Sequence, residues 1–481
     1  MRAQRRTRAL IFGTVGAVAV ALTLAVYAGH ILRSLELKTV DTRFVVRGSQ
    51  DAPSDLAVVQ IDDVTFNDLR NSKRPAQWPF SRCYHASVID RIAKASPRAI
   101  AVDIQFTEPS SSAACDNKLI EAVGRAGNVV LATTEVDGHG RTAIFGGDDV
   151  LKQLGARAGN AILPADSDGV IRHVPYATQG LTSFGIVAAQ VAYGNRSTRD
   201  GGPTSPVPNG AGSSPIERPT TSKPWIDFVG APGTISAYSY SRVLDGKVPS
   251  SAFRNKLVVI GPSATSLQDV HATAGSGNEV MSGAEIQANV AETAIHGFRL
   301  RSLAPRWEIL LIVLFGLIAP VMSLRLRGWH SPALAVGIGV LYAFAAQLAF
   351  NHGRVVPLTY PLLALMLSAI GVLVAEYLLE AFERVRTHDT FSRFVPEAVV
   401  NQVLARTGGE LRLGGELVEG TAMFTDLRGF TTFSEGLEAE EVIDLLNGYL
   451  GEISDAVLAH GGTLVSYLGD GLMAVFGAPL P

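Results

Sequence analysis

The sequence has 481 residues, of which 47% are hydrophobic and 18% are charged, with a formal net charge of −3. Roughly 25% of an average soluble protein is charged, so part of this chain is expected to lie in lipid. The net charge excludes an overall basic field of the kind that attracts nucleic acid. Cys83 and Cys115 are the two cysteines. They form no Cys-x-x-Cys motif, which excludes cysteine-based zinc and iron–sulfur sites.

Four stretches are apolar and long enough to cross a bilayer, which takes about 20 residues. The first follows Arg2, Arg5, Arg6 and Arg8, and its long core favours an uncleaved anchor over a secretory signal. The other three are separated by short loops, which favours a membrane bundle over buried core helices. We expect transmembrane helices at residues 9–29, 305–324, 332–350 and 355–379.

The basic residues predict the orientation, because cytoplasmic loops carry an excess of arginine and lysine. The N-terminal residues 1–8 are then cytoplasmic, residues 30–304 extracytoplasmic and the tail from Glu380 cytoplasmic. Arg299, Arg301 and Arg306 go against this rule, but they flank a long external domain, where the rule is weak. We therefore expect a multi-pass protein of the plasma membrane, with the lipid bilayer as one of its partners.

Residues 30–304 have the pattern of an α/β domain. Short β-branched runs alternate with helical spacing, as in a sheet covered by helices. The predicted strands are Leu56–Ile61, Arg98–Ile104 and Lys256–Gly261, and Tyr84–Ala95 is a predicted helix. Residues 195–223 are rich in Gly, Pro, Ser and Thr, so we interpret them as a flexible insertion.

The order of several short motifs in this domain resembles a CHASE-type extracellular sensor of the second subtype. The resemblance rests on Leu35-Glu36, Asp41-Thr-Arg-Phe44, Ile61-Asp62-Asp63, Trp78-Pro-Phe-Ser-Arg82, Ala101-Val-Asp-Ile-Gln-Phe106, Asp166-Ser-Asp-Gly-Val-Ile-Arg172 and Gly283-Ala-Glu-Ile-Gln-Ala-Asn289. It implies one N-terminal anchor, three later transmembrane helices, an unknown extracellular ligand, and a kinase or cyclase as the output domain.

Charged residues of the sensor are candidates for a ligand pocket. Arg82, Asp103 and Arg172 are the candidates, since guanidinium groups suit carboxylates and phosphates. The alternative is that Asp62, Asp103 and Asp168 cap turns and pair with these arginines. A disulfide between the two cysteines suits an external domain, but their spacing alone leaves the bridge open.

The residues after the last apolar stretch predict a linker and a second domain. A helical apolar stripe of Leu378, Phe382 and Val385 continues from the last apolar stretch into residues 380–413. This stripe fits either a two-stranded signalling helix or a helix packed on its own domain, because it is shorter than three heptads. Residues 414–481 then show a strand, a helix, and two strands joined by a tight turn, which is a β-α-β-β order.

Two aspartates of this second domain fall at strand ends that this order can bring together. Asp426 ends the first strand, and Asp470 lies in the tight turn Leu468-Gly-Asp-Gly471. Paired carboxylates suit two magnesium ions, to which the Leu427 carbonyl could add a ligand. Taken singly, Asp470 could be only a turn residue and Asp426 only a helix cap.

The same residues resemble a class III adenylate/guanylate cyclase. The motifs are Phe394-Val-Pro-Glu397, Gly414-Gly-Glu416, Phe424-Thr-Asp-Leu-Arg-Gly-Phe-Thr431 and Gly469-Asp-Gly-Leu-Met-Ala-Val-Phe-Gly477, with the two aspartates 44 residues apart. The resemblance implies that Asp426 and Asp470 bind two Mg²⁺ or Mn²⁺ ions and that the domain works as a homodimer through linker and cyclase domain. The substrate is ATP or GTP, whose ribose 3′-hydroxyl attacks the α-phosphate and releases pyrophosphate. Residues expected to contact it are Phe430, Thr431, Ser466, Gly469 and Gly471.

Two features depart from the family pattern. Ser466 stands where the family usually has a lysine that reads the purine, which leaves the choice of ATP or GTP open. The family's transition-state asparagine and arginine are expected beyond Pro481. We therefore expect a fragment of a longer catalytic domain that is inactive by itself.

The predicted fold class is a multi-domain membrane protein with an α/β extracellular sensor, four transmembrane α-helices and an incomplete ferredoxin-like α+β cyclase domain. One alternative is a non-catalytic receptor or degenerate cyclase that dimerises with an active cyclase. A diguanylate cyclase is disfavoured because its Gly-Gly-Asp/Glu-Glu-Phe turn is replaced by Leu-Gly-Asp-Gly. A transporter is disfavoured because the apolar stretches carry almost no charge.

Overall fold

The computed structural model describes residues 2–72, 76–194, 216, 218–277, 279–326, 330–392 and 417–478. The chain forms two compact units, Met1–Gly371 and Val372–Pro481. The first contains the sensor and most of the membrane helices, and the second contains the residues that resemble a cyclase.

A six-stranded parallel sheet forms the centre of the sensor, in the order β4-β3-β2-β8-β1-β7. The four inner strands β3, β2, β8 and β1 are short apolar runs that are almost wholly buried, as parallel strands usually are, whereas the edge strands β4 and β7 are partly exposed. Leu257 of β8 is the register partner of both Leu56 and Ala99, so β8 lies between β1 and β2. The strands are β1 (Leu56–Ile61), β2 (Ala99–Val102), β3 (Val129–Thr133), β4 (Arg157–Asn160), β7 (Ala237–Ser239) and β8 (Leu257–Pro262).

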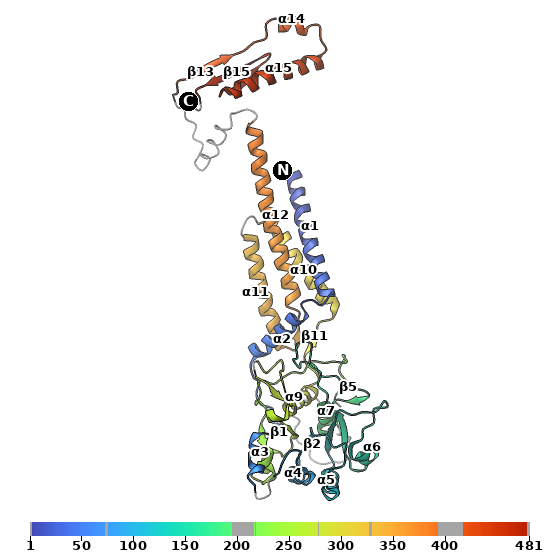
Figure 1. The fold of residues 1–481 in the computed structure, drawn as a ribbon. Coiled ribbons are helices and arrows are strands. Elements are labelled where there is room, and N and C mark those ends of the chain that lie inside the picture. Colours follow the sequence, from blue (N-terminus) through green and yellow to red (C-terminus); the bar gives the residue numbers. More distant parts are fainter. Residues whose placement is uncertain are drawn as a thin grey trace. The chain divides into compact units, whose positions relative to one another are not determined.

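Helices cover both faces of this sheet and create two cores (Figure 1). One core lies under α2 (Arg33–Arg47), α7 (Phe184–Ala189) and α9 (Gly283–Ile295). The other lies under α3 (Asp63–Arg70), α4 (Arg82–Ala93), α5 (Ala113–Ala126), α6 (Asp148–Gln153) and α8 (Tyr240–Leu244). Successive residues of β1 alternate between the cores, with Val58 in the first and Val59 in the second. The predicted α/β class of the sensor is confirmed.

Short elements complete the sensor. They are the strand pairs β5 (Ala177–Thr178) with β6 (Leu181–Thr182) and β9 (Val270–His271) with β10 (Met281–Ser282), and helical turns at Ile144–Gly146, Gln190–Gly194, Ser250–Ala252 and Thr265–Leu267. Most of the predicted flexible insertion, residues 195–215 and 217, lies outside the described residues. Its end is part of the fold, because the Tyr176 amide donates to the Ser222 carbonyl at 3.0 Å.

Within the described part of the chain, four helices are long and apolar enough to cross a membrane: α1 (Arg2–Ala28), α10 (Pro305–Ser323), α11 (His330–Asn351) and α12 (Thr359–Ser392). The last begins at Thr359 rather than at Val355, the expected start. Arg354 and Val355 instead form the strand β12, which pairs in parallel with β11 (Arg301–Ser302). Pro357 also disfavours a helical conformation in the residue before it.

The ends of three membrane helices meet beside the sensor. The Tyr27 hydroxyl at the end of α1 donates to Glu308 of α10 at 2.7 Å, and its ring contacts that of Tyr360 in α12. Glu36 of α2 accepts the backbone amides of Leu358 and Thr359 at 2.9 and 2.7 Å, which caps the start of α12. The N-terminal end of α1 is therefore the end far from the sensor, and α12 starts at the sensor and runs away from it.

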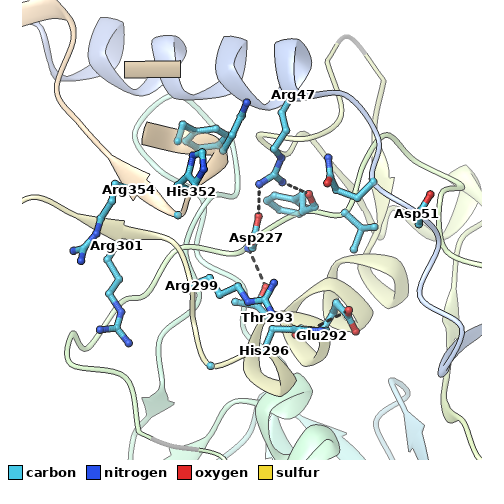
Figure 2. Close-up of a pocket in the computed structure, with 17 residues that line it drawn as sticks. Arg47, Asp51, Asp227, Glu292, Thr293, His296, Arg299, Arg301, His352 and Arg354 are labelled. Carbon is cyan, nitrogen blue, oxygen red and sulfur yellow. Dashed lines mark hydrogen bonds and ion pairs between the residues drawn. The ribbon is translucent and has the colours of Figure 1, made fainter. Parts of the chain in front are cut away.

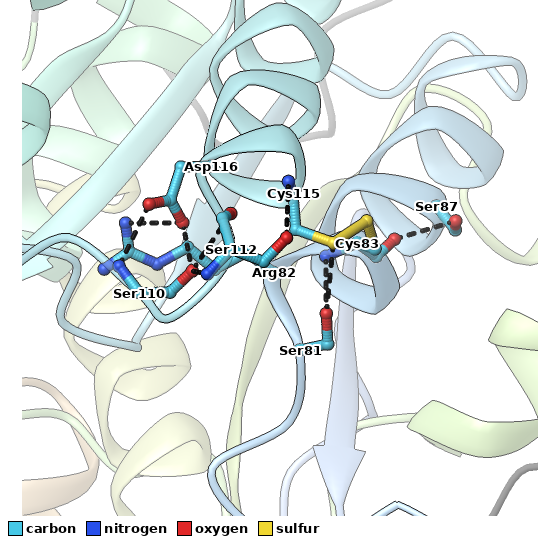
Figure 3. Close-up of a disulfide and its surroundings, with 8 residues drawn as sticks. All are labelled: Ser81, Arg82, Cys83, Ser87, Ser110, Ser112, Cys115 and Asp116. Atoms are coloured by element: carbon cyan, nitrogen blue, oxygen red, sulfur yellow. Dashed lines mark hydrogen bonds and ion pairs between the residues drawn. A yellow bond between two sulfur atoms is a disulfide. The ribbon is translucent and has the colours of Figure 1, made fainter.

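Cys83 and Cys115 form a disulfide, with their Cα atoms 4.7 Å apart (Figure 3). The bridge joins the first turn of α4 to the first turn of α5. Ser81 and Ser112 are the N-caps of these two helices, which brings their starting turns into register. The spacing in the sequence left the pairing of the two cysteines open, and the packing of the two helix N-termini brings them together.

The second unit contains a three-stranded antiparallel sheet in the order β13-β15-β14. Its elements are β13 (Thr421–Phe424), α14 (Phe430–Ser434), α15 (Ala439–Ala459), β14 (Thr463–Leu468) and β15 (Gly471–Phe476). The predicted order is present, with two helices instead of one between the first two strands. Val457 of α15 packs on Leu472 and Ala474 of β15. The motifs Phe394–Glu397 and Gly414–Glu416 and most of the predicted linker lie outside the described residues.

Candidate functional site

Asp426 and Asp470 lie at the same end of the second unit's sheet. Phe424, the last residue of β13, pairs with Met473, and Leu468 pairs with Gly471 across the hairpin turn. Because β15 runs antiparallel to β13, the turn that starts β15 lies beside the loop that ends β13. The loop carries Asp426 and the turn carries Asp470.

Gly471 brings the turn and the loop into direct backbone contact. A Cβ atom on Gly471 would overlap the Thr425 carbonyl oxygen and would lie 3.3 Å from the Asp426 Cα. Thr425 fixes this contact twice: its amide donates to the Leu472 carbonyl, and its hydroxyl oxygen accepts the Leu472 amide, both at 3.0 Å. The role of Thr425 could not be predicted from the sequence, since a threonine before an aspartate carries no specific signal.

For Asp426 the alternative role was a helix cap, and for Asp470 it was a turn residue. Asp426 is not a helix cap, because Gly429 is the N-cap of α14 and Glu438 that of α15. Asp470 does occupy the hairpin turn, next to Gly469, whose φ of 69° suits glycine. Among the described residues, neither carboxylate has a hydrogen-bond or ion-pair partner. Both are therefore available to an external cation.

The donor set fits a metal site that substrate and water would complete. Asp426 is exposed and Asp470 partly exposed. The Leu427 carbonyl accepts the Phe430 amide at 3.2 Å, which leaves it one lone pair. The described residues contain no group of three or more acidic, histidine or cysteine side chains that could hold a metal. Two carboxylates and a carbonyl match Mg²⁺, which usually keeps several waters and binds substrate phosphates.

The remaining predicted substrate residues surround this end of the sheet in different ways. Phe430 and Thr431 start α14, four and five residues after Asp426. Ser466 is exposed on β14, where its hydroxyl donates to the Tyr467 carbonyl at 3.2 Å. Ser466 pairs with Met473 of β15, so the central strand separates it from β13.

The sensor candidate Arg172 is fully buried and forms ion pairs with three aspartates (0% exposed). The distances are 2.7 Å to Asp41, 3.0 Å to Asp166 and 2.7 Å to Asp168. The hydrogen bonds that Arg172 donates to Asp168 hold the pKa of this carboxyl group below its usual value. The geometry matches the alternative of internal pairing, and it leaves Arg172 no free face for a ligand.

Arg82 and Asp103, the other two candidates, have different partners from Arg172. Arg82 pairs with Asp116 at 3.2 Å (Figure 3). It also donates a hydrogen bond to the Glu108 carbonyl. Asp103 follows β2 at the carboxyl end of the sheet, where burial and the nearby Asp269 raise its pKa to about 7. Asp62, the other predicted capping residue, accepts the Thr65 amide at 2.8 Å as the N-cap of α3. A ligand role for Arg82 and Asp103 stays a prediction.

Comparisons with known proteins cover both units. The CHASE2 domain family matches residues 17–321, and the adenylate and guanylate cyclase catalytic domain family matches residues 417–481. "Adenylate cyclase 1" of Rhizobium meliloti (strain 1021) is 39% identical over 93 residues, which are 19% of this chain and 14% of that protein. "Adenylate cyclase" of Anabaena cylindrica is 34% identical over 92 residues, 19% of this chain and 18% of that protein.

A third relative, "Adenylate cyclase, terminal-differentiation specific" of Dictyostelium discoideum, is 34% identical over 99 residues, 20% of this chain and 5% of that protein. The matches thus span less than a fifth of each of these three cyclases. The match to the sensor family is wider, since it covers more than half of the 481 residues. The chain belongs to the CHASE2 family, and its C-terminal residues are a segment of an adenylate and guanylate cyclase catalytic domain.

Proposed function

We propose that this chain is part of a membrane receptor that converts ATP or GTP into a 3′,5′-cyclic nucleotide and pyrophosphate under the control of an extracellular signal. The observation that carries the proposal is the contact of Gly471 with Thr425, which brings the loop of Asp426 beside the turn of Asp470. It occurs in the segment that matches cyclase catalytic domains.

Asp426, Asp470 and the Leu427 carbonyl would hold two Mg²⁺ or Mn²⁺ ions. Such ions, when bound, favour the ionised form of an attacking hydroxyl and stabilise the leaving oxygen. The chain's own contribution is placement. Gly469 and Gly471 present bare backbone beside the carboxylates, so a triphosphate can approach closely. Phe430 and Thr431 begin α14 at the same end of the sheet, four and five residues after Asp426.

The proposed topology places the sensor outside the cytoplasm and both ends of the chain inside. The hydrogen bond between Tyr27 and Glu308 supports this topology. It places the C-terminal end of α1 beside the sensor, so the N-terminal end of α1 lies far from the sensor, and α12 runs away from the sensor as well. The disulfide also suits an oxidising compartment. Reporter fusions at Gly210 and His388 test the topology, and a cytoplasmic signal from Gly210 would contradict it.

A homodimer is the proposed assembly of the second unit. Several of its large apolar side chains are exposed, among them Phe424 (64%), Val465 (53%) and Leu468 (52%). Exposed apolar surface of this kind is typical of a site for a protein partner. The proposed partner is a second copy of the same chain, bound through the linker and the cyclase segment. Analytical ultracentrifugation in detergent measures whether this dimer forms.

The proposal is tested by removing one carboxylate at a time from the full-length gene product in membranes. Asp426→Ala and Asp470→Ala should each lower cyclase activity at least a hundredfold, since a bound metal supplies several kcal/mol of transition-state stabilisation. Asp444→Ala is the matched control, because Asp444 is exposed on α15. Near-normal turnover of either test variant at saturating manganese would contradict the metal assignment.

A non-catalytic partner of an active cyclase is the second candidate, and the replacement of the family's lysine by Ser466 favours it. In that case the chain shows no turnover alone, while its co-expression changes the activity of a complete cyclase. The same Asp426→Ala variant distinguishes the two functions. A non-catalytic partner uses no metals of its own, so its effect on the activity of the complete cyclase should survive the substitution.

A further inference from the structure

A cavity of about 620 Å³ lies between the sensor and the loop that joins α11 to α12 (Figure 2). Its lining combines the end of α2, the end of α9, the segment leading into β11, and the turn into β12. The lining contains four arginines and two histidines: Arg47, Arg299, Arg301, Arg354, His296 and His352. Arg299 and Arg301 are two of the arginines that go against the positive-inside rule.

Arg301 and Arg354 are direct register partners in the parallel pair β11–β12. Figure 2 shows their side chains projecting to the same side from neighbouring strands. Both residues are exposed, and neither forms an ion pair with any residue that the structure describes. Like charges on directly paired strand residues destabilise the pair, so a bound anion would relieve this repulsion.

The other charges of the cavity are largely paired with one another. Arg47 binds Asp227 at 2.8 Å and donates to the Phe228 carbonyl. Glu292 lies 3.1 Å from His296 and raises the pKa of that imidazole. Asp51 also lines the cavity, so its four arginines exceed its three carboxylates by one, and Arg299, Arg301 and Arg354 form no ion pair with any described residue.

Two buried atoms of the lining also have unused hydrogen-bonding capacity. The Arg47 Nε and one carboxylate oxygen of Glu292 have no partner among the described residues. Both atoms are inaccessible to solvent, so they add to the polarity of the lining without contacting an occupant of the cavity.

We propose that Arg299, Arg301 and Arg354 bind a phosphate group, and that this anion joins the end of the sensor to the hairpin of α11 and α12. Guanidinium groups are suited to phosphate because their fixed fork forms two parallel hydrogen bonds. β12 directly follows a helix that can cross the membrane and precedes another. The site thus lies at the level of the membrane surface, where the phosphate belongs to a lipid headgroup or to a free solute. The proposal does not depend on cyclase activity.

The test measures thermal melting of the purified, delipidated chain in neutral detergent. Inorganic phosphate is compared with sodium chloride at equal ionic strength, and phosphatidylglycerol vesicles are compared with phosphatidylcholine vesicles after reconstitution. Phosphate should raise the melting temperature if the source is soluble, and phosphatidylglycerol alone should raise it if the source is a headgroup. Either response supports the site, whereas no response in both arms overturns it.

The variants assign the response to the facing arginines. Arg301→Gln and Arg354→Gln should each raise, about tenfold or more, the phosphate or phosphatidylglycerol concentration needed for half of the stabilisation, as expected for a lost charged hydrogen bond. In chloride alone the same variants should melt at or above the wild-type temperature, because the like-charge pair is gone. Arg306→Gln is the control, since Arg306 stacks on Trp307 outside the cavity. A variant that melts lower in chloride but keeps the wild-type response would assign a structural role to these arginines and overturn the proposal.

Discussion

Gly471 and Thr425 are in contact through their backbones, with no space for a side chain on Gly471. Gly471→Ala should therefore separate β15 from the loop of Asp426 and abolish cyclase activity of the full-length gene product. Gly448→Ala is the matched control, because a Cβ at Gly448 in α15 meets no atom within 4 Å. Alanine there should stabilise the helix by about 0.5–1 kcal/mol. Limited proteolysis of both variants reports the folding of the segment, and wild-type activity of Gly471→Ala would show that this contact does not position the site.

The ion-pair cluster around Arg172 should be essential for the stability of the sensor. Arg172→Met leaves Asp41, Asp166 and Asp168 without their shared partner, and a broken buried pair costs about 3–5 kcal/mol. The free energy of unfolding is measured by urea titration followed by tryptophan fluorescence. Arg141→Gln serves as the control, since Arg141 is 69% exposed in its pair with Asp137, and exposed pairs contribute about 0–1 kcal/mol. Equal stability of the two variants would contradict this assignment.

Asp103 should make the sensor less stable as the pH rises. Its pKa is about 7 in the folded chain, against an ordinary value of 3.8, because of burial and the nearby Asp269. The folded state thus binds the proton more tightly, so the free energy of unfolding falls between pH 4 and pH 7 and levels off above. His271, which lies 3.2 Å from Asp269, opposes the shift.

Asp103→Asn should remove this part of the pH dependence and stabilise the sensor most at and above pH 7. Melting curves from pH 4.5 to 8 measure the effect. Asp137→Asn is the control, because hydrogen bonds lower the pKa of Asp137 to about 2, outside this range. Parallel pH profiles of Asp103→Asn and the wild type would contradict the shifted pKa.

Ser466 should limit both the rate and the purine selectivity of the full-length enzyme. A hydrogen bond from a charged donor contributes roughly 1.5–3 kcal/mol, against about 1 kcal/mol for a neutral one. Ser466→Lys should therefore raise kcat/KM for ATP about tenfold. Formation of cyclic AMP and cyclic GMP is compared for both proteins with the same metal. If the wild type already selects ATP by several hundredfold, another residue reads the base, and an unchanged variant would show that Ser466 does not face the purine.

Local patterns in the sequence were sufficient for most single elements. The apolar run Leu56–Ile61 is β1 with the same bounds, and the turn at Asp470 joins two strands as its Gly-Asp-Gly sequence predicts. Pairings between distant residues could not be predicted in this way. Arg172 meets Asp41, 131 positions earlier, and Arg301 faces Arg354, because tertiary packing and not neighbouring residues determines these contacts.

The same limit explains the misplaced start of the last membrane helix. Val355 continues an apolar run, but it is used as a strand residue because β11 offers it a backbone partner. The carboxylate network at the sensor end of α12 was also missed, since Glu36 reaches residues more than 320 positions away. A single sequence carries no signal for such a contact.

The position of β8 between β1 and β2 has a consequence for biosynthesis. Leu257 completes a sheet whose neighbouring strands begin at Leu56 and Ala99, so the two halves of the sensor stay unjoined until β8 has left the ribosome. Closing loops of this length makes such a sheet slow to form. During that interval the apolar edges of β1 and β2 are open to other chains. A pause in translation before Leu257 would prolong this exposure, and a nascent sensor is then most in need of a chaperone.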